Sequence, residues 1–208
     1  MDKLIVKKVQ IEMLVDRGYD IPPEEIIFLT SDITPRFVKK YKGKSLNNFY
    51  KKNNETLFVY YMTQNKIIED LKIFIDNIVY YDTGLIVGIE EGEFNKKKYH
   101  KLFEDLPFKP IETFTFDDLS YNVTKHVNYD QHELIDKMII IPTLVDIDQL
   151  PLLLKSDPVC RYFNWSIGDV IKITRRYANL GMLNQTDIGM LNQTDIGYRV
   201  VTIHQYML

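Results

Sequence analysis

Two carboxylates, Asp82 and Glu90, stand just before and at the end of an apolar run that is typical of a buried strand. Carboxylates in such positions can hold Mg²⁺ in a nuclease, where a lysine two residues after the glutamate helps to position the attacking water. Gly92 occupies that position here, and the lysines at 96–98 come several residues later. A metal-dependent nuclease is therefore kept as an alternative hypothesis, although the lysine that such a site uses is missing from its expected position.

The histidines and the single cysteine show no spacing that supports metal binding or nucleophilic catalysis. No second histidine or cysteine stands at a metal-ligand spacing from any of His100, His126, His132 and His204, so no metal site is expected. Glycine-rich phosphate loops and the G-x-S-x-G motif are also absent from the sequence. Cys160 falls within a predicted short helix, where a small packed residue is the simpler interpretation. We therefore expect neither a catalytic residue nor a cofactor in this chain.

The composition is that of an ordinary soluble protein. The chain has 208 residues, of which 45% are hydrophobic and 26% charged, and its net charge is -3. This charge creates no general attraction to nucleic acid, so any such contact must involve a local patch. One cysteine, no signal-peptide core and no apolar run of roughly 18 residues predict an intracellular protein of a reducing compartment.

One segment, residues 35–52, is strongly basic. It contains no acid, and aromatic residues interrupt its seven cations, which are Arg36, Lys39, Lys40, Lys42, Lys44, Lys51 and Lys52. Such a segment can neutralise phosphates. It can equally be a solvated face whose aromatic residues pack inward. The pattern leaves both interpretations open.

The first part of the chain alternates between strand and helix patterns. Strands are predicted at 56–62, 84–90 and 111–116, and helices at 3–18, shortly after Ile21, at 64–77, at 95–104 and after Asp117-Asp118. This alternation favours parallel pairing with right-handed crossovers. We predict an N-terminal α/β domain, residues 1–129, with a mostly parallel sheet and helices in three layers.

The remaining residues, 130–208, predict a small α+β domain with short strands. Asp157 and Pro158 are suited to the N-cap and first position of a helix that ends near Phe163, with Asn164 as its stop. Gly168-Asp169 then turns the chain into a strand at 170–174. This strand is expected to pair antiparallel with a closing strand at 198–204, and a further strand is predicted at 138–142.

An octapeptide, GMLNQTDI, occurs at 181–188 and again without change at 189–196. Its period is too short for a solenoid repeat, and loop closure costs little extra as a loop lengthens. We therefore predict an enlarged loop at 175–197 without chemistry, and a binding repeat is the less favoured interpretation.

Three motifs stand in a fixed order: QLP at 149–151, SDPVCRYF at 156–163 and GDVIKI at 168–173. Their order and spacing resemble the C-terminal domain of a small RNA polymerase subunit, which is the fifth subunit in eukaryotes and has a shorter counterpart in archaea. QHELI at 131–135 is similar to the H-x-L-V motif of that family. YRVV at 198–201 is similar to its closing strand, and MLVDRGY at 13–19 to the opening helix of its eukaryotic form.

The chain also departs from the family pattern. Asp136 and Met138 replace a proline and a second histidine, and only 143–149 remain where the family has a helix of several turns. The duplicated loop replaces a Thr-Ala-Gly turn. Together with the N-terminal half, which archaeal members lack, these changes suggest a version encoded by a large DNA virus, located in the host cytoplasm or the virion.

The resemblance implies a non-catalytic subunit of a DNA-directed RNA polymerase. The C-terminal domain would dock on the largest subunit, and the N-terminal domain would form a jaw beside downstream duplex DNA, with no membrane or small-molecule partner. The positions carried over for docking or architecture are His132, Leu134, Asp157, Pro158, Arg161, Tyr162, Gly168 and Arg199. The jaw role makes Arg36, Lys39, Lys40, Lys42 and Lys44 the DNA-proximal candidates. A free-standing transcription adaptor with the same surface is a further alternative.

Overall fold

The computed structural model describes residues 3–63, 66–103, 109–136, 147–177 and 193–203. The chain separates into two compact units, residues 1–122 and 123–208, which we call unit 1 and unit 2 and treat separately. The sequence had placed this division at 129/130. None of the helices in the described part has the length and apolar character that a membrane span requires.

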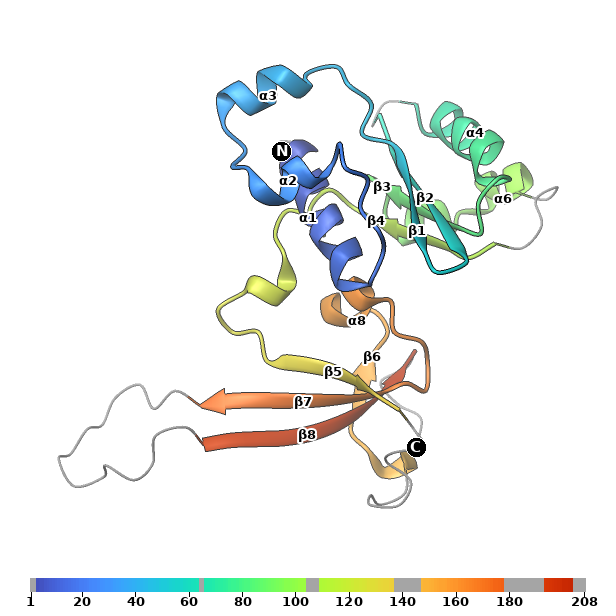
Figure 1. Cartoon of the computed structure of the whole chain (residues 1–208). Helices are drawn as coiled ribbons and strands as arrows, with labels where there is room; N and C mark the ends of the chain where they lie inside the picture. The colour runs from blue at the N-terminus through green and yellow to red at the C-terminus, as the bar shows by residue number, and fades with distance from the viewer. Residues whose placement is uncertain (1–2, 64–65, 104–108, 137–146, 178–192, 204–208) are drawn as a thin grey trace. The chain divides into compact units, whose positions relative to one another are not determined.

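Unit 1 contains a mixed four-stranded sheet in the order β1-β2-β3-β4 (Figure 1). The strands are β1 (Asn48–Lys52), β2 (Glu55–Tyr61), β3 (Thr83–Val87) and β4 (Ile111–Phe114). β1 and β2 form an antiparallel hairpin, whereas β2, β3 and β4 pair in parallel. The three predicted strands are therefore present, and β1 is an addition that the sequence did not predict.

Helix α4 (Ile67–Ile78) covers one face of this sheet. Its Leu71, Phe74 and Ile78 are buried in a cluster with Phe58, Tyr60 and Ile86 of the strands. The helix lies so close to β3 that a Cβ on Gly84 would stand 2.6 Å from the Phe74 ring. The predicted helix at 64–77 is confirmed, and it crosses between two parallel strands as expected.

Helix α1 (Lys3–Asp16) contacts the opposite face of the sheet. Its Lys7 and Gln10 form hydrogen bonds with Tyr50 and Tyr61, whose side chains alternate with those that face α4. Gly18, at φ 83°, ends this helix in the left-handed conformation that glycine adopts readily. The short helices α2 (Ile26–Thr30) and α3 (Pro35–Tyr41) pack against α1 through Phe28 and Phe37.

Three helix predictions in unit 1 need correction. The helix expected after Ile21 begins at Ile26, because a turn closed by the Glu25 amide and the Pro22 carbonyl precedes it. The helix expected at 95–104 begins two residues later, as α6 (Lys97–Phe103), and a separate short helix that was not predicted, α5 (Glu91–Phe94), precedes it. No helix forms after Asp117-Asp118, where the Asp118 carboxylate accepts the Thr115 amide and closes a turn.

Unit 2 is built on a second mixed sheet in the order β5-β7-β8-β6 (Figure 1). Its strands are β5 (Gln131–Ile135), β6 (Leu152–Leu154), β7 (Val170–Tyr177) and β8 (Gln193–Thr202). β7 pairs antiparallel with both β5 and β8, and β6 runs parallel to β8. The predicted antiparallel pairing of 170–174 with the closing strand is confirmed. The described part of the unit also contains two single-turn 3₁₀ helices, η1 (Val123–Lys125) and η2 (Ile147–Gln149).

Helix α8 (Pro158–Phe163) packs on the sheet of unit 2 and has the predicted bounds. Val159 and Cys160 of the helix are buried with Trp165 and with Ile171 of β7. A separate hydrophobic core therefore supports this small domain. The strand expected at 138–142 lies outside the described residues.

The predicted bounds of the loop at 175–197 extend too far at both ends, into strands β7 and β8. β7 continues to Tyr177 and β8 begins at Gln193, so the second copy of the octapeptide contributes its last four residues to a strand. Arg175 and Asp195 stand opposite each other in this extension and form an ion pair at 3.8 Å. Such cross-strand pairs support strands of polar composition. The first copy lies outside the described residues.

Candidate functional site

The SDPVCRYF motif forms a capped helix in unit 2. The Asp157 carboxylate accepts the Val159 amide at 2.8 Å, and Pro158 occupies the first turn, where a missing N–H costs nothing. At the other end Asn164 is left-handed, at φ 55°, and its amide donates to the carbonyls of the last turn. Both ends of α8 are thus fixed by the residue types that the sequence singled out.

Lys155 joins the start of this segment to its end. Its ammonium donates to the Asn164 side-chain oxygen at 3.0 Å and to the Trp165 carbonyl. A cation beside the carbonyls that end a helix is also electrostatically favourable. Lys155 was not among the predicted residues, because only the folded chain brings it beside Asn164.

The turn between α8 and β7 is fixed onto β8. Gly168 has φ 83°, and its amide donates to the Val201 carbonyl at 2.8 Å. The Asp169 carboxylate accepts the Ser166 amide at 2.7 Å, which closes the turn. Gly168 thus has a backbone conformation that glycine adopts readily, in the turn that the sequence predicted at Gly168-Asp169.

A row of aromatic rings joins β5 to α8. His132 lies between Tyr129 and Trp165, at centroid distances of 5.4 and 6.2 Å. Trp165 in turn stacks on Phe163 at 4.9 Å, and Phe163 meets Tyr162 edge to face. The His132 ring nitrogen Nδ1 lies 2.6 Å from the Asp130 carbonyl oxygen. His132 and Tyr162 thus belong to one packed structure, although 30 residues separate them in sequence.

The remaining motif residues are Arg199, Arg161 and Leu134, and their surroundings differ. Arg199 of β8 donates to the Leu152 carbonyl at 3.3 Å and so supports the parallel pairing of β6. Arg161 is half-buried on α8. Leu134 of β5 differs from the others, because 52% of its side chain is exposed although it is a large apolar residue.

The basic segment of unit 1 forms the amphipathic helix α3 and the residues that follow it. Thr34 caps the helix by accepting the Phe37 amide, and Pro35 takes the first position. Phe37 and Tyr41 stack on each other at 4.6 Å and pack on Phe28. The aromatic residues of α3 therefore pack inward, as one of the two interpretations expected, whereas Phe49 of the same basic segment is 45% exposed.

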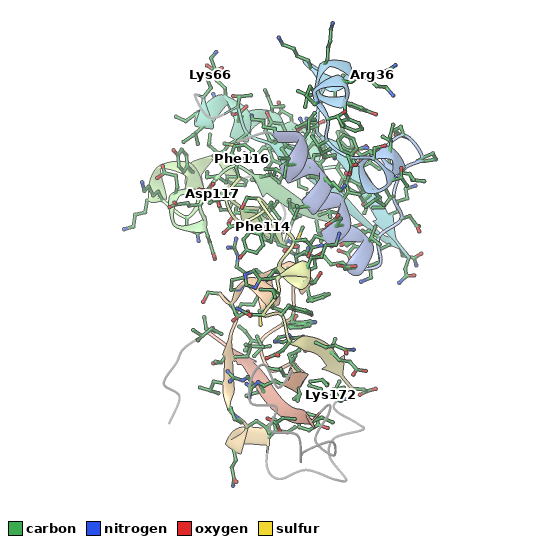
Figure 2. The ribbon with its side chains drawn as sticks, turned by 90° about the vertical axis from the view of Figure 1, so that its left-hand side faces the viewer. Arg36, Lys66, Phe114, Phe116, Asp117 and Lys172 are labelled. Atoms are coloured by element: carbon green, nitrogen blue, oxygen red, sulfur yellow. The ribbon has the colours of Figure 1, made fainter. Side chains whose placement is uncertain are left out.

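The cations of the same segment are exposed. Arg36, Lys39, Lys40, Lys42 and Lys44 all face solvent, and Figure 2 shows the Arg36 side chain directed away from the rest of unit 1. Within the ranges that the structure describes, none of these five forms an ion pair. Lys40 and Lys44 lie against the Tyr41 ring at 5.5 and 4.9 Å, which leaves their charge uncompensated. This basic surface can attract an anionic partner.

A buried polar network that was not predicted joins α1 to β1. The Lys7 ammonium is 2.8 Å from the Glu25 carboxylate and donates to the Tyr50 hydroxyl at 2.7 Å. Tyr50 donates to the other Glu25 oxygen at 2.5 Å. Burial lowers the pKa of Lys7, although Glu25 opposes this, and burial raises the pKa of Tyr50 far above its ordinary value. The role of the network is structural.

The two carboxylates of the nuclease alternative are not brought together. β3 lies between Asp82 and Glu90, and at about 3.3 Å per residue its five residues span roughly 16 Å. Asp82 accepts the Thr56 amide and hydroxyl, each at 2.7 Å, and these bonds lower its pKa. In the described part of the chain, no group of three His, Cys, Asp or Glu side chains is placed to hold a metal ion. This geometry contradicts a nuclease site built on the pair.

Cys160 is fully buried in the core of unit 2. Burial, together with the nearby Asp157 carboxylate, raises the pKa of its thiol to about 12. A thiol with so little thiolate at neutral pH is a poor nucleophile. The interpretation of Cys160 as a packed residue therefore agrees with its surroundings.

Known proteins resemble the chain over both units. Residues 121–183, which include β5, β6, α8 and β7, match the family model of the RNA polymerase Rpb5 C-terminal domain. The subunit 5B of DNA-directed RNA polymerases IV and V from Arabidopsis thaliana is 24% identical over 180 residues, covering 82% of this chain and 81% of that protein. The DNA-directed RNA polymerase subunit 5-like protein 1 of the same plant is 28% identical over 200 residues, covering 83% and 88%. Subunit RPABC1 of DNA-directed RNA polymerases I, II, and III from Caenorhabditis briggsae is 23% identical over 190 residues, covering 85% and 90%.

Proposed function

We propose that this chain, which belongs to the family of the fifth subunit of DNA-directed RNA polymerases, docks on the largest polymerase subunit through unit 2 and lies near downstream DNA through unit 1. Members of the family are accessory subunits, and the chain is accordingly a non-catalytic subunit with other polymerase subunits as its partners. The proposal assigns no cofactor or metal to it.

The observation that carries the docking role is the agreement between the family match and the fixed architecture of unit 2. The matched region holds α8, capped at both ends, and the turn at Gly168 that is tied to β8. A site that presents a rigid surface needs such pre-organisation more than it needs reactive groups. Leu134, a large apolar residue exposed on β5, is the motif residue that we infer faces a partner.

The exposed cations of α3 and of the residues that follow it support the DNA-proximal role of unit 1. Five of them lie between Arg36 and Lys44 without a carboxylate partner among the described residues, while the net charge of the chain is -3. A local patch of this kind binds phosphates without reading sequence. Helices α1 and α4 contact opposite faces of the sheet, which supports the three-layer arrangement of such a jaw.

Affinity purification tests the assignment. The tagged full-length chain, expressed in the cell or infected cell that naturally contains it, should recover the largest polymerase chains in near-stoichiometric amount. A free-standing adaptor would recover them in much smaller amount or only with other transcription proteins. Recovery of no polymerase chain would refute the proposal.

A further inference from the structure

Strand β5 forms one edge of the sheet in unit 2. The strand order is β5-β7-β8-β6, so in the described part of the chain β5 has a neighbour on one side only. All five of its residues pair with β7 in an uninterrupted antiparallel register. In such a pair every second residue turns its N–H and C=O away from the neighbouring strand. Where they have no other partner, these groups form a ready template for another strand; the His132 amide already donates to the Tyr129 hydroxyl at 3.4 Å.

The side chains of β5 indicate that the sheet is incomplete at this edge. Leu134 stands opposite Ile171, and His132 opposite Ile173, on the face that packs against α8. Ile171 is fully buried, whereas 52% of Leu134 is exposed. Among the described residues, the apolar face of the sheet thus continues onto β5 without a cover. A further strand beside β5 would bury Leu134.

Two of the other edge strands in the described part of the chain, β6 and β1, carry features that hinder strand addition. β6 has only three residues and follows Pro151, which has no N–H to donate. β1 pairs with Asp20 on its outer side and ends in Lys51 and Lys52. β5 has no proline, lysine or bulge, and Glu133 is its one charged side chain among the devices that usually protect an edge.

The central residue of β5 argues against a second copy of the chain as its neighbour. Two copies of β5 paired antiparallel about their centre would place Glu133 opposite Glu133, and like charges directly opposite are destabilising. The Glu133 side chain is 55% exposed, and its one ion pair in the described residues is with Lys172 at 3.3 Å. The charge therefore suits a strand that brings a lysine or arginine.

We propose that β5 is completed in the assembled polymerase by an extended strand of a partner subunit. This strand pairs with the outer edge of β5, covers Leu134 with an apolar side chain and places a basic side chain near Glu133. The inference deepens the docking role proposed above and rests on it. It identifies the mode of recognition as main-chain pairing, in which side chains add specificity.

Hydrogen exchange of the full-length chain, alone and within the purified polymerase, tests this pairing. In the chain alone, the outward amides of residues 131–135 should exchange rapidly where they have no partner; the His132 amide, which donates to the Tyr129 hydroxyl, is the exception. In the polymerase, exchange of the peptide that covers β5 should slow by at least about tenfold, because its outward amides gain partners. Equal exchange in the two states would overturn the inference.

Substitution of Leu134 gives an independent test. Leu134→Glu should reduce retention of the chain in the polymerase by at least about tenfold, the effect of a charge placed in a covered apolar contact. Leu134→Val should retain binding. Ile196→Glu is the matched control, since Ile196 of β8 is 51% exposed and lies outside β5. Circular dichroism of the free variants should match the native chain, because Leu134 is half exposed there.

The outcomes separate this inference from the proposed function. Polymerase that retains Leu134→Glu as well as the native chain, with β5 unprotected, would refute strand pairing and leave the subunit assignment standing. Absence of the native chain from the polymerase would refute both. Protection of β5 in the chain alone, with a dimer in sedimentation, would assign the edge to a second copy.

Discussion

The guanidinium of Arg17 and the carboxylate of Glu112 form two parallel hydrogen bonds, each 2.9 Å long, between the end of α1 and the edge strand β4. The Arg17 side chain is 4% exposed and that of Glu112 is 24% exposed. The planar fork of arginine matches a carboxylate in this two-bond geometry, which lysine cannot reproduce. The pair therefore ties the end of α1 to β4, the strand at one edge of the sheet of unit 1.

Arg17→Ala should lower the free energy of unfolding of unit 1 by about 3 kcal/mol, because it leaves a largely buried carboxylate without its cation. Arg17→Lys should recover only part of this loss. Urea unfolding followed by far-ultraviolet circular dichroism measures the change. Lys66→Ala, which breaks the exposed pair with Glu69, is the control and should cost at most about 0.5 kcal/mol. Equal effects of the Arg17→Ala and Lys66→Ala changes would contradict this account.

The N-cap of α8 gives a prediction for unit 2. Asp157→Ala should destabilise this unit by about 1 kcal/mol, because the Val159 amide loses its acceptor, whereas Asp157→Asn should cost much less. Trp165, the one tryptophan of the chain, is buried beside this helix, so its fluorescence reports the unfolding of unit 2. An unchanged fluorescence midpoint for Asp157→Ala would show that the cap is dispensable.

Gly168 provides a separate test of the turn that follows α8. Gly168→Ala should cost about 1–2 kcal/mol, because an L-residue at φ 83° is strained in the left-handed region. Gly168→Asn should be milder, since asparagine tolerates this region better than alanine. The same tryptophan fluorescence measures both variants. A Gly168→Ala variant as stable as the native chain would mean that the turn can change its conformation.

Buried tyrosines predict a loss of stability at alkaline pH. Burial raises the pKa of Tyr19 to about 12 and raises those of Tyr50, Tyr60 and Tyr61 further, whereas an unfolded tyrosine ionises near pH 10. Their contribution is thus fully present below about pH 10 and is lost as the pH rises through the folded-state values. Lys7, whose pKa is lowered, has the opposite effect below its unfolded value of 10.5.

The test compares the urea midpoints of unfolding above the unfolded-state pKa of Lys7, between about pH 10.5 and 11.5. The native chain should lose stability across this interval, and Tyr50→Phe should lose less, because it removes one of the groups that must stay protonated. Phenolate absorbance should show that these tyrosines ionise only when the chain unfolds. A midpoint that does not change with pH would contradict the assignment.

The helix α8 and the strands β2, β3 and β4 could be predicted from sequence because their signals are local. Asp157, Pro158 and Asn164 mark the ends of α8, continuous apolar runs mark β2 and β3, and an alternating pattern marks β4. β1 was missed because it is an edge strand in which only Tyr50 is buried, so lysines dominate its composition.

Tertiary contacts explain what the sequence could not show. Arg17 and Glu112 lie far apart in the chain, and nothing in either local pattern connects them. The buried ion pair of Lys7 and Glu25 could likewise not be predicted, because an analysis of hydrophobic periodicity assigns lysine to the surface. The extension of β7 and β8 beyond 174 and before 198 was missed because polar residues there gain stability from pairing with each other.

The duplicated octapeptide should be dispensable. Deleting 181–188 retains every residue of β7 and β8 and roughly halves the connection between them, which should stabilise unit 2 by about 0.6 kcal/mol through loop closure. Tryptophan fluorescence in urea measures this change. A large loss of stability, or of retention in the polymerase, would show that the repeat has a role of its own.

Charge reversal tests the DNA-proximal surface. The triple variant Lys39→Glu, Lys40→Glu and Lys42→Glu should weaken retention of downstream DNA by the assembled polymerase by at least about fivefold and reduce its dependence on salt, because phosphate contacts release counterions. The control reverses Lys66, Lys72 and Lys97, which are exposed elsewhere on unit 1 and give the same change in net charge. Equal behaviour of the two triple variants would assign any effect to net charge alone.

The most direct measurement of the central claim is the subunit composition of polymerase purified through a tag on its largest subunit. Quantitative mass spectrometry of the salt-washed complex should find this chain at about one copy per largest subunit, as expected for an accessory subunit of a closed assembly. Absence of the chain, or its loss in a mild salt wash while the other subunits remain, would contradict the assignment.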